Sequence, residues 1–178
     1  FIKEIAFKKE VKSAKITVTA IGFYYCLVND KAVTDTLFNP GWTAYEKRVQ
    51  TQCYNITNLI NQKTKFEFQL AAGWGGSRHL GWMSHGQLVY TDPCLYFEIE
   101  IEYVDGQKEV IKSDESWDVF TNEYEFAEIY DGETVNALYE REFLGKAVIH
   151  EYKTKLIPQE GPYVVRGERI PAKELIIT

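Results

Sequence analysis

Residues 95–113 read LYFEIEIEYVDGQKEVIKS, and this stretch decides the fold class. Apolar residues alternate with glutamates. Because side chains along a strand point to opposite faces in turn, one face is predicted to be buried and the other wet. The Asp105-Gly106 pair tolerates the positive φ of a tight turn, so residues 108–113 are predicted to return as the partner strand. The side chains expected on the buried face are Leu95, Phe97, Ile99, Ile101 and Tyr103.

Similar alternation recurs on both sides of this hairpin, in KITVTAI (15–21), KFEFQL (65–70) and SWDVFT (116–121). The chain is expected to close with the extended segments VVRGERI (164–170) and ELIIT (174–178). One segment, ITNLINQ, is predicted to form a helical turn that opens at Thr57, a residue type that caps helix N-termini. Many short strands separated by Gly, Pro, Asn and Asp predict an all-β fold, an antiparallel two-sheet β-sandwich of jelly-roll type.

Composition excludes several classes of protein. The 178 residues carry a net charge of −6, and the 20 lysines and arginines are scattered, so no basic stripe is available for nucleic acid. No apolar run is long enough to span a membrane. The N-terminal FIKEIAFKKE mixes charge into its apolar residues, unlike a signal peptide, and this slightly favours a cytoplasmic protein. The three cysteines, Cys26, Cys53 and Cys94, lack metal-ligand spacing and are expected to be buried free thiols.

A glycine-rich stretch, AAGWGGSRHLGWMSHGQ (71–87), lies between predicted strands. It lacks the Lys-Ser/Thr ending of a phosphate-binding loop. His79 and His85 are six residues apart with no third ligand at a matching interval, which argues against a metal site. Sugar recognition fits better, because pyranose C–H faces pack on indole rings and hydroxyls pair with polar groups. The alternative is that these tryptophans belong to the core, as is common in β-sandwiches.

A second cluster of polar residues, EYEFAEIYDGETVNALYERE (123–142), is rich in carboxylates. A glycosidase needs two acids separated by a few ångströms across a cleft, but spacing alone does not bring any pair to a cleft. Glutamates that alternate with apolar residues more often form the wet side of a strand. No catalytic residue is therefore assigned. The acids concerned are Glu123, Glu125, Glu128, Asp131, Glu133 and Glu140.

Several motifs together resemble the N-terminal β-sandwich domain of bacterial α-L-rhamnosidases. They are VNDKAVTDTLFNPGWTAYEKRVQTQCYNIT (28–57), AAGWGGSRHLGW (71–82), IEIEYVDGQKEVIKSDESWDV (99–119) and IYDGETVNA (129–137), and they share the order and spacing of that family from about Lys15 to the C-terminus. The residues that carry the resemblance are Asn29, Pro40, Gly41, Trp42, Thr43, Tyr45, Arg48, Tyr54, Thr57, Gly73, Trp74, Asp114, Ser116, Trp117, Tyr130, Asp131, Gly132 and Glu133.

The resemblance implies a non-catalytic accessory module that aids substrate recognition. In such a parent protein the module precedes further β-domains and a catalytic (α/α)₆ barrel, which hydrolyses terminal α-L-rhamnosides with inversion. Residues 1–178 are then expected to be one domain excised from a larger enzyme and inactive alone. The alternative is a scaffold that packs against the barrel or a second subunit without binding ligand. Within the binding hypothesis, Trp74 and Trp82 stack on the sugar, and its hydroxyls pair with Arg78, His79, Asp131 and Glu133.

The chain departs from the family pattern in two places. It has Val135-Asn136-Ala137-Leu138 where the family commonly reads Tyr-Asp-Ala-Arg, and Asp30 follows Asn29 where the family commonly has Asn-Gly. Any polar contacts that the family makes through the first segment are therefore in question here. Some related modules bind sugar through calcium, but no compact set of Asp and Asn has ligand-like spacing, so no cofactor or metal is expected and calcium is left open.

Overall fold

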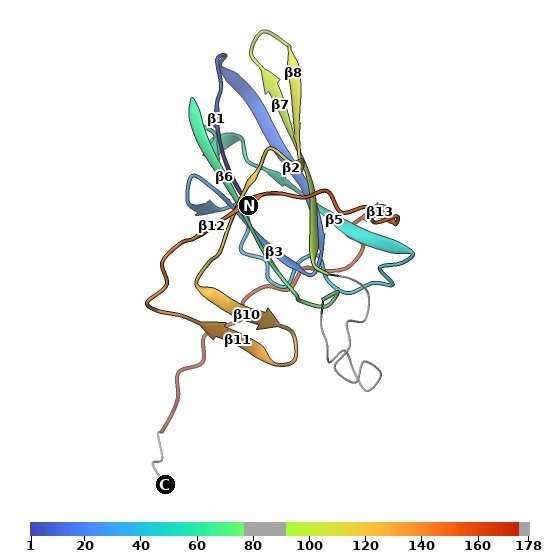
Figure 1. Cartoon of the computed structure of the whole chain (residues 1–178), viewed down its shortest axis with the longest axis vertical. Coiled ribbons are helices and arrows are strands. Elements are labelled where there is room, and N and C mark those ends of the chain that lie inside the picture. Colours follow the sequence, from blue (N-terminus) through green and yellow to red (C-terminus); the bar gives the residue numbers. More distant parts are fainter. Residues whose placement is uncertain (77–91, 175–178) are drawn as a thin grey trace.

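The computed structural model describes residues 1–76 and 92–174, and in them strands dominate (Figure 1). The strands are β1 (Ile2–Ala6), β2 (Val11–Ile21), β3 (Phe23–Val28), β4 (Lys31–Ala32), β5 (Arg48–Asn55), β6 (Lys63–Ala71), β7 (Cys94–Tyr103), β8 (Lys108–Lys112), β9 (Asp118–Phe120), β10 (Tyr124–Glu128), β11 (Gly132–Val135), β12 (Phe143–Lys146) and β13 (Lys155–Pro158). One sheet has the order β12-β9-β1-β6-β3-β4 and a second β13-β5-β2-β7-β8, while β10 and β11 form a separate hairpin.

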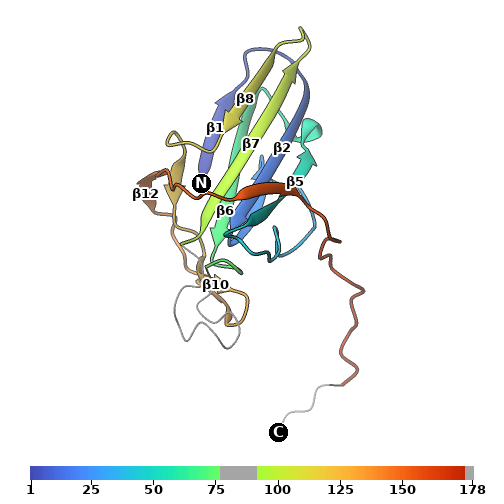
Figure 2. The same ribbon diagram turned by 90° about the vertical axis from the view of Figure 1, so that its right-hand side faces the viewer.

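The core lies between the two larger sheets, and alternation along each strand explains it. Ile16 and Val18 of β2 and Ile99 of β7 are fully buried, whereas the residues between them are more exposed. Across the interface, the rings of Phe68 and Phe97 stack with centroids 3.9 Å apart. Figure 2 shows β2, β5, β7 and β8 side by side in one layer. The buried faces predicted for residues 15–21, 65–70 and 95–103 are thus confirmed, with Leu95 and Leu70 half-buried at the edge.

Apart from the β3–β4 and β7–β8 hairpins, the chain alternates between the layers from β1 to β9: β1, β3, β6 and β9 belong to the six-stranded sheet and β2, β5 and β7 to the five-stranded one. The prediction of an all-β fold with packed antiparallel sheets is confirmed, and the finer jelly-roll assignment stays a prediction. One pairing differs: β13 runs parallel to β5, with Lys155 opposite Arg48 and Pro158 opposite Thr51. The hairpin predicted from residues 95–113 is present as β7 and β8, with Gly106 at a φ of 84°.

Two local predictions need correction. The turn at Thr57 is a 3₁₀ helix, η1 (Thr57–Leu59), whose N-cap residue is Ile56 without a side-chain cap. The Thr57 hydroxyl instead accepts the Ala14 backbone N–H at 2.9 Å and so ties the turn to β2. In residues 164–170 only Val164 pairs, in a bridge to Leu37, and residues 175–178 lie outside the described part of the chain.

The three cysteines are free thiols, and Cys26 is buried as expected, whereas Cys94 is half-buried. The expectation of a buried thiol is wrong for Cys53, which is exposed because it follows the buried Gln52 on β5 and so points to the opposite face. Burial raises the pKa of the Cys94 thiol. No helix within residues 1–76 or 92–174 is long and apolar enough to cross a membrane.

Candidate functional site

The loop after β6 lies unusually close to the start of β3. Gly73 has a φ of +51°, and a Cβ atom there would lie 2.5 Å from the Phe23 backbone nitrogen. A Cβ atom on Gly75 would lie 2.3 Å from the Ile21 side chain. Real side chains do not tolerate such distances, so both positions require glycine. The intervening Trp74 is thereby held against Phe23, with ring centroids 6.2 Å apart.

Trp74 is the centre of an aromatic cluster whose five residues come from four separate segments. Its indole stacks on Trp42 at 5.8 Å with an interplanar angle of 15°, and meets the Tyr130 ring edge-on at 6.3 Å. Phe23 contacts Phe38 at 5.4 Å on the other side. These separations are typical of favourable aromatic pairs. We refer to Phe23, Phe38, Trp42, Trp74 and Tyr130 as the aromatic cluster.

The cluster is anchored on a satellite core, and two of its rings are more than half exposed. Trp74 is half-buried and packs against a small satellite core of Ile21, Tyr45 and Val49. Trp42 and Tyr130 are 55% and 54% exposed. An exposed indole that is fixed by a second indole behind it offers a flat, rigid apolar surface, which is the surface that a sugar ring requires.

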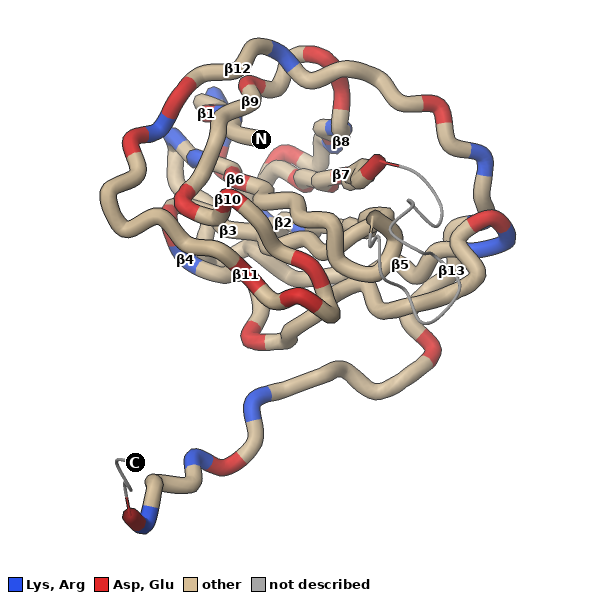
Figure 3. Tube along the Cα trace, turned by 60° about the horizontal axis from the view of Figure 1, so that its bottom comes forward, with Lys and Arg blue, Asp and Glu red and all other residues tan. Residues whose placement is uncertain are grey.

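The β10–β11 hairpin places Tyr130 and two carboxylates beside this surface. Glu128 is buried, and its Oε1 accepts the backbone N–H groups of Tyr130 and Asp131 at 2.8 and 2.9 Å. The backbone of Glu128 also forms an isolated β-bridge with Gly73. This bridge joins the hairpin to the loop that carries Trp74. Asp131 and Glu133 are exposed on this hairpin, and Figure 3 shows acidic residues along β10 and β11. Glu128 therefore acts as a structural anchor of the turn.

Three of the six side chains expected to contact sugar are described by the structure. Trp74 belongs to the aromatic cluster, and Asp131 and Glu133 lie on the hairpin whose turn contributes Tyr130. Arg78, His79 and Trp82 lie outside the described residues. The role of all six in binding stays a prediction.

Sequence reasoning did not assign Trp42, Phe38, Phe23 or Tyr130 to the site. A signal was present, because Trp42 and Tyr130 occur in NPGWTAY and IYDGE, where aromatic residues adjoin turn-forming residues. Among residues 1–76 and 92–174, no group of three or more His, Cys, Asp and Glu side chains could hold a metal ion.

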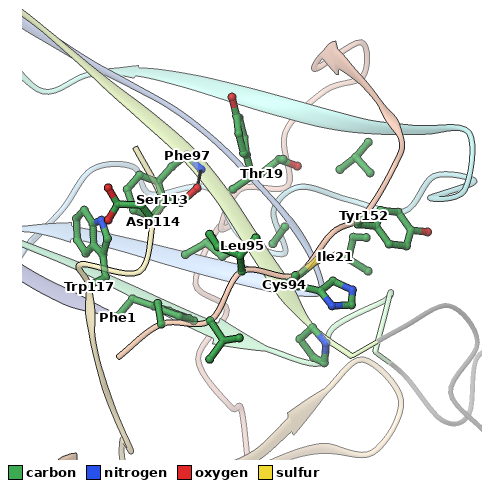
Figure 4. Close-up of a pocket in the computed structure, with 18 of the residues that line it drawn as sticks. Phe1, Thr19, Ile21, Cys94, Leu95, Phe97, Ser113, Asp114, Trp117 and Tyr152 are labelled. Atoms are coloured by element: carbon green, nitrogen blue, oxygen red, sulfur yellow. Dashed lines mark hydrogen bonds between the residues drawn. The ribbon is translucent and has the colours of Figure 1, made fainter. Parts of the chain in front are cut away.

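Two hollows flank the sandwich. A cleft of about 820 Å³ lies against β1, β6 and β9 and is closed by β10 and by residues 136–142. A more apolar pocket of about 400 Å³ lies under residues 147–156, which cross the sheet on the side of β7 (Figure 4). Ile21, Cys94 and Tyr152 lie together at one end of this pocket, and Phe97 and Trp117 lie at the other.

Comparison with known proteins gives the family. The sequence profile described as the alpha-L-rhamnosidase N-terminal domain matches residues 9–155. The chain belongs to this family. The alpha-L-rhamnosidase of Formosa agariphila is 34% identical over 137 residues, which are 76% of this chain and 15% of the relative. The resemblance found in the sequence is therefore confirmed.

Solved structures of alpha-L-rhamnosidases also match this chain. The alpha-L-rhamnosidase of Aspergillus terreus superposes with a TM-score of 0.70 and 32% identity, covering 74% of this chain and 15% of that one. The Streptomyces avermitilis alpha-L-rhamnosidase, solved in complex with L-rhamnose, gives a TM-score of 0.67 and 31% identity over 76% of this chain and 13% of its own. The chain thus spans about 15% of the length of the relatives that it matches.

Proposed function

We propose that this rhamnosidase-family domain is a non-catalytic accessory module that helps a longer α-L-rhamnosidase engage rhamnose-containing glycosides. Residues 1–178 are one β-sandwich domain of that parent chain, and the acids that hydrolyse the substrate belong to its catalytic (α/α)₆ barrel. Support comes from the family and from the small share of the relatives that this domain covers.

The observation that carries the proposal is that Trp42, which is 55% exposed, stacks on Trp74 beside the hairpin with Asp131 and Glu133. L-Rhamnose is a 6-deoxy sugar whose methyl group and C–H faces favour an aromatic surface, while its hydroxyls pair with carboxylates. Carboxylate oxygens accept hydrogen bonds from hydroxyl groups. The arrangement therefore supplies both kinds of contact.

A second candidate function, a scaffold that packs against the barrel or another subunit, is favoured by a different observation. Phe143, Leu144, Val148 and Ile149 are all exposed within seven consecutive residues. Apolar side chains gathered in this way often mark an interface that another domain covers. Both roles can coexist, because this strip and the aromatic cluster are formed by different residues.

Titration with L-rhamnose, followed by tryptophan fluorescence and NMR shifts, tests the binding role. We expect saturable shifts, and we expect Trp42→Ala to weaken binding about tenfold, which corresponds to about 1.4 kcal/mol. Val110→Ala, at an exposed position of β8, is the control and should bind as the wild type does. If tens of millimolar sugar cause no perturbation, the binding free energy is no more than about 2 kcal/mol. That result would contradict the binding role and favour the scaffold role.

The absence of catalysis in the isolated domain is a separate prediction. An aryl α-L-rhamnoside incubated with this domain at high protein concentration should release no phenol above the buffer rate, because the carboxylates of 123–142 serve as surface or turn groups here. Turnover that is lost in Glu125→Gln or Glu133→Gln would contradict the assignment of chemistry to another domain.

A further inference from the structure

One face of the six-stranded sheet connects the aromatic cluster to the polar cleft. The residues of β3 that point away from the core are Phe23, Tyr25 and Leu27, since Tyr24, Cys26 and Val28 are buried. On β6, Tyr25 pairs with Gln69 and Leu27 pairs with Glu67. Directly paired residues project to the same side of a sheet. Phe23 of the cluster and Gln69 and Glu67 of the cleft therefore share the outer face.

The polar groups of the cleft are held in fixed orientations. Arg141 contacts Glu67 at 3.3 Å, and the Gln69 side-chain amide donates to the same carboxylate at 3.3 Å. On the opposite wall, the Asn136 amide donates to Glu125 at 2.9 Å. Amide, carboxylate and guanidinium groups that already hold one another lose little freedom when they bind a hydroxyl. The cleft of about 820 Å³ has room for more than one sugar ring.

Cluster and cleft are also continuous along the chain. Glu67 and Gln69 line the cleft and Trp74 follows on the same segment, while β10 contributes Tyr124 and Glu125 to the cleft and leads to Tyr130. Phe23 and Leu27 are four residues apart on β3, which is about 13 Å. A single pyranose ring does not cover that length, but a short oligosaccharide does. Tyr25, which is 41% exposed, lies midway between Phe23 and Leu27 and can pack against the sugar ring in the middle of the oligosaccharide.

We infer that the Glu67–Arg141 cleft is a second carbohydrate subsite and that the ligand is a neutral oligosaccharide laid from the aromatic cluster over Tyr25 into the cleft. The inference rests on the proposed function and adds the length and charge of the ligand. Arg141 is the only lysine or arginine among the described residues that line the cleft. The carboxylates that line it with Arg141 disfavour an anionic sugar: Glu67, Glu125, Glu140 and Glu142.

Calorimetry with L-rhamnose and with a linear tetrasaccharide of α-linked L-rhamnose tests this arrangement. The tetrasaccharide should bind the wild type at least about tenfold more tightly than the monosaccharide. Tyr25→Ala and Gln69→Ala should each remove about three- to tenfold of the tetrasaccharide affinity and leave the L-rhamnose Kd unchanged. Tyr96→Ala is the matched control, because Tyr96 is 37% exposed on β7 of the other sheet. Thermal unfolding of each variant checks that it folds.

The outcomes separate the two proposals. If L-rhamnose binds but the tetrasaccharide binds no more tightly, the second subsite is wrong and the recognition role stands. If Tyr25→Ala and Gln69→Ala weaken both ligands equally, the cleft is not a separate subsite and the inference also fails. If neither ligand binds, the recognition role itself is wrong and the inference falls with it. A tetrasaccharide with one rhamnose replaced by a uronic acid should bind more weakly, and equal binding would refute the preference for a neutral ligand.

Discussion

Two tryptophan-centred clusters in this molecule have comparable distances between their rings but differ widely in how much of the tryptophan is exposed. Trp117 meets Phe97 and Phe68 edge-on at 4.7 and 5.5 Å, and its indole N–H donates to the Lys112 carbonyl at 2.9 Å. It is 1% exposed. Trp42 stacks on Trp74 at a comparable 5.8 Å and keeps 55% of its surface exposed.

The difference between them lies in what covers each ring. Trp117 precedes β9 and is enclosed between two sheets, whose facing side chains surround it. Trp42 and Trp74 lie on connections between strands, where Trp74 packs on the satellite core and Trp42 is 55% exposed. The distance between rings therefore does not distinguish an enclosed cluster from an exposed one, whereas the presence of a second layer does.

The largest expected effect is at the enclosed ring. Trp117→Ala removes a fully buried indole and should lower the free energy of unfolding by about 3–5 kcal/mol, because the cavity collapses only in part. Trp42→Ala should lower it by less than about 1 kcal/mol, since its ring is more than half exposed. Urea denaturation of both variants measures the contrast. Equal losses would show that Trp42 is a core residue in solution.

An intermediate effect is expected where the loop that carries Trp74 lies against β3. Gly73→Ala combines a positive φ with a backbone overlap, so it should destabilise by about 1–3 kcal/mol and alter tryptophan fluorescence. Gly132→Ala is the control, because Gly132 also has a positive φ, of 78°, but a Cβ atom there meets nothing within 4 Å. Thermal unfolding compares the two. A loss at Gly73 no greater than at Gly132 would mean that the loop moves away without cost.

The smallest effect is expected at the β7–β8 turn, remote from both clusters. Lys9 and the Gln107 N–H hold the pKa of Asp105 below its usual value. A lowered folded-state pKa stabilises the protein above the unfolded value and ceases to do so as the pH falls through the folded value. Asp105→Asn should therefore lower the melting temperature slightly at pH 7 and leave it unchanged near pH 2. A difference that persists at pH 2 would assign the effect to the turn rather than to charge.

The candidate site was only partly accessible to sequence reasoning. Trp74, Asp131 and Glu133 were predicted because their residue types suit a sugar and occur in two short stretches, and their role in binding stays a prediction. Trp42 was not assigned to the site, although 32 residues along the chain it meets Trp74 face to face. Glu128 looked like one more surface acid, and its burial depends on two backbone N–H groups of a turn that the alternating pattern does not specify.

The sequence by itself determined the strands within residues 15–21, 65–70 and 95–113 and which of their faces are buried, because alternation is a local property with a period of two residues. It also determined the family, through motifs preserved along most of the chain. Only the tertiary structure decided which tryptophan is enclosed, that β13 pairs in parallel with β5, and that Phe23, Tyr25 and Gln69 share one face with the cleft. These features depend on contacts between residues far apart in sequence, whose geometry is set when the two sheets pack.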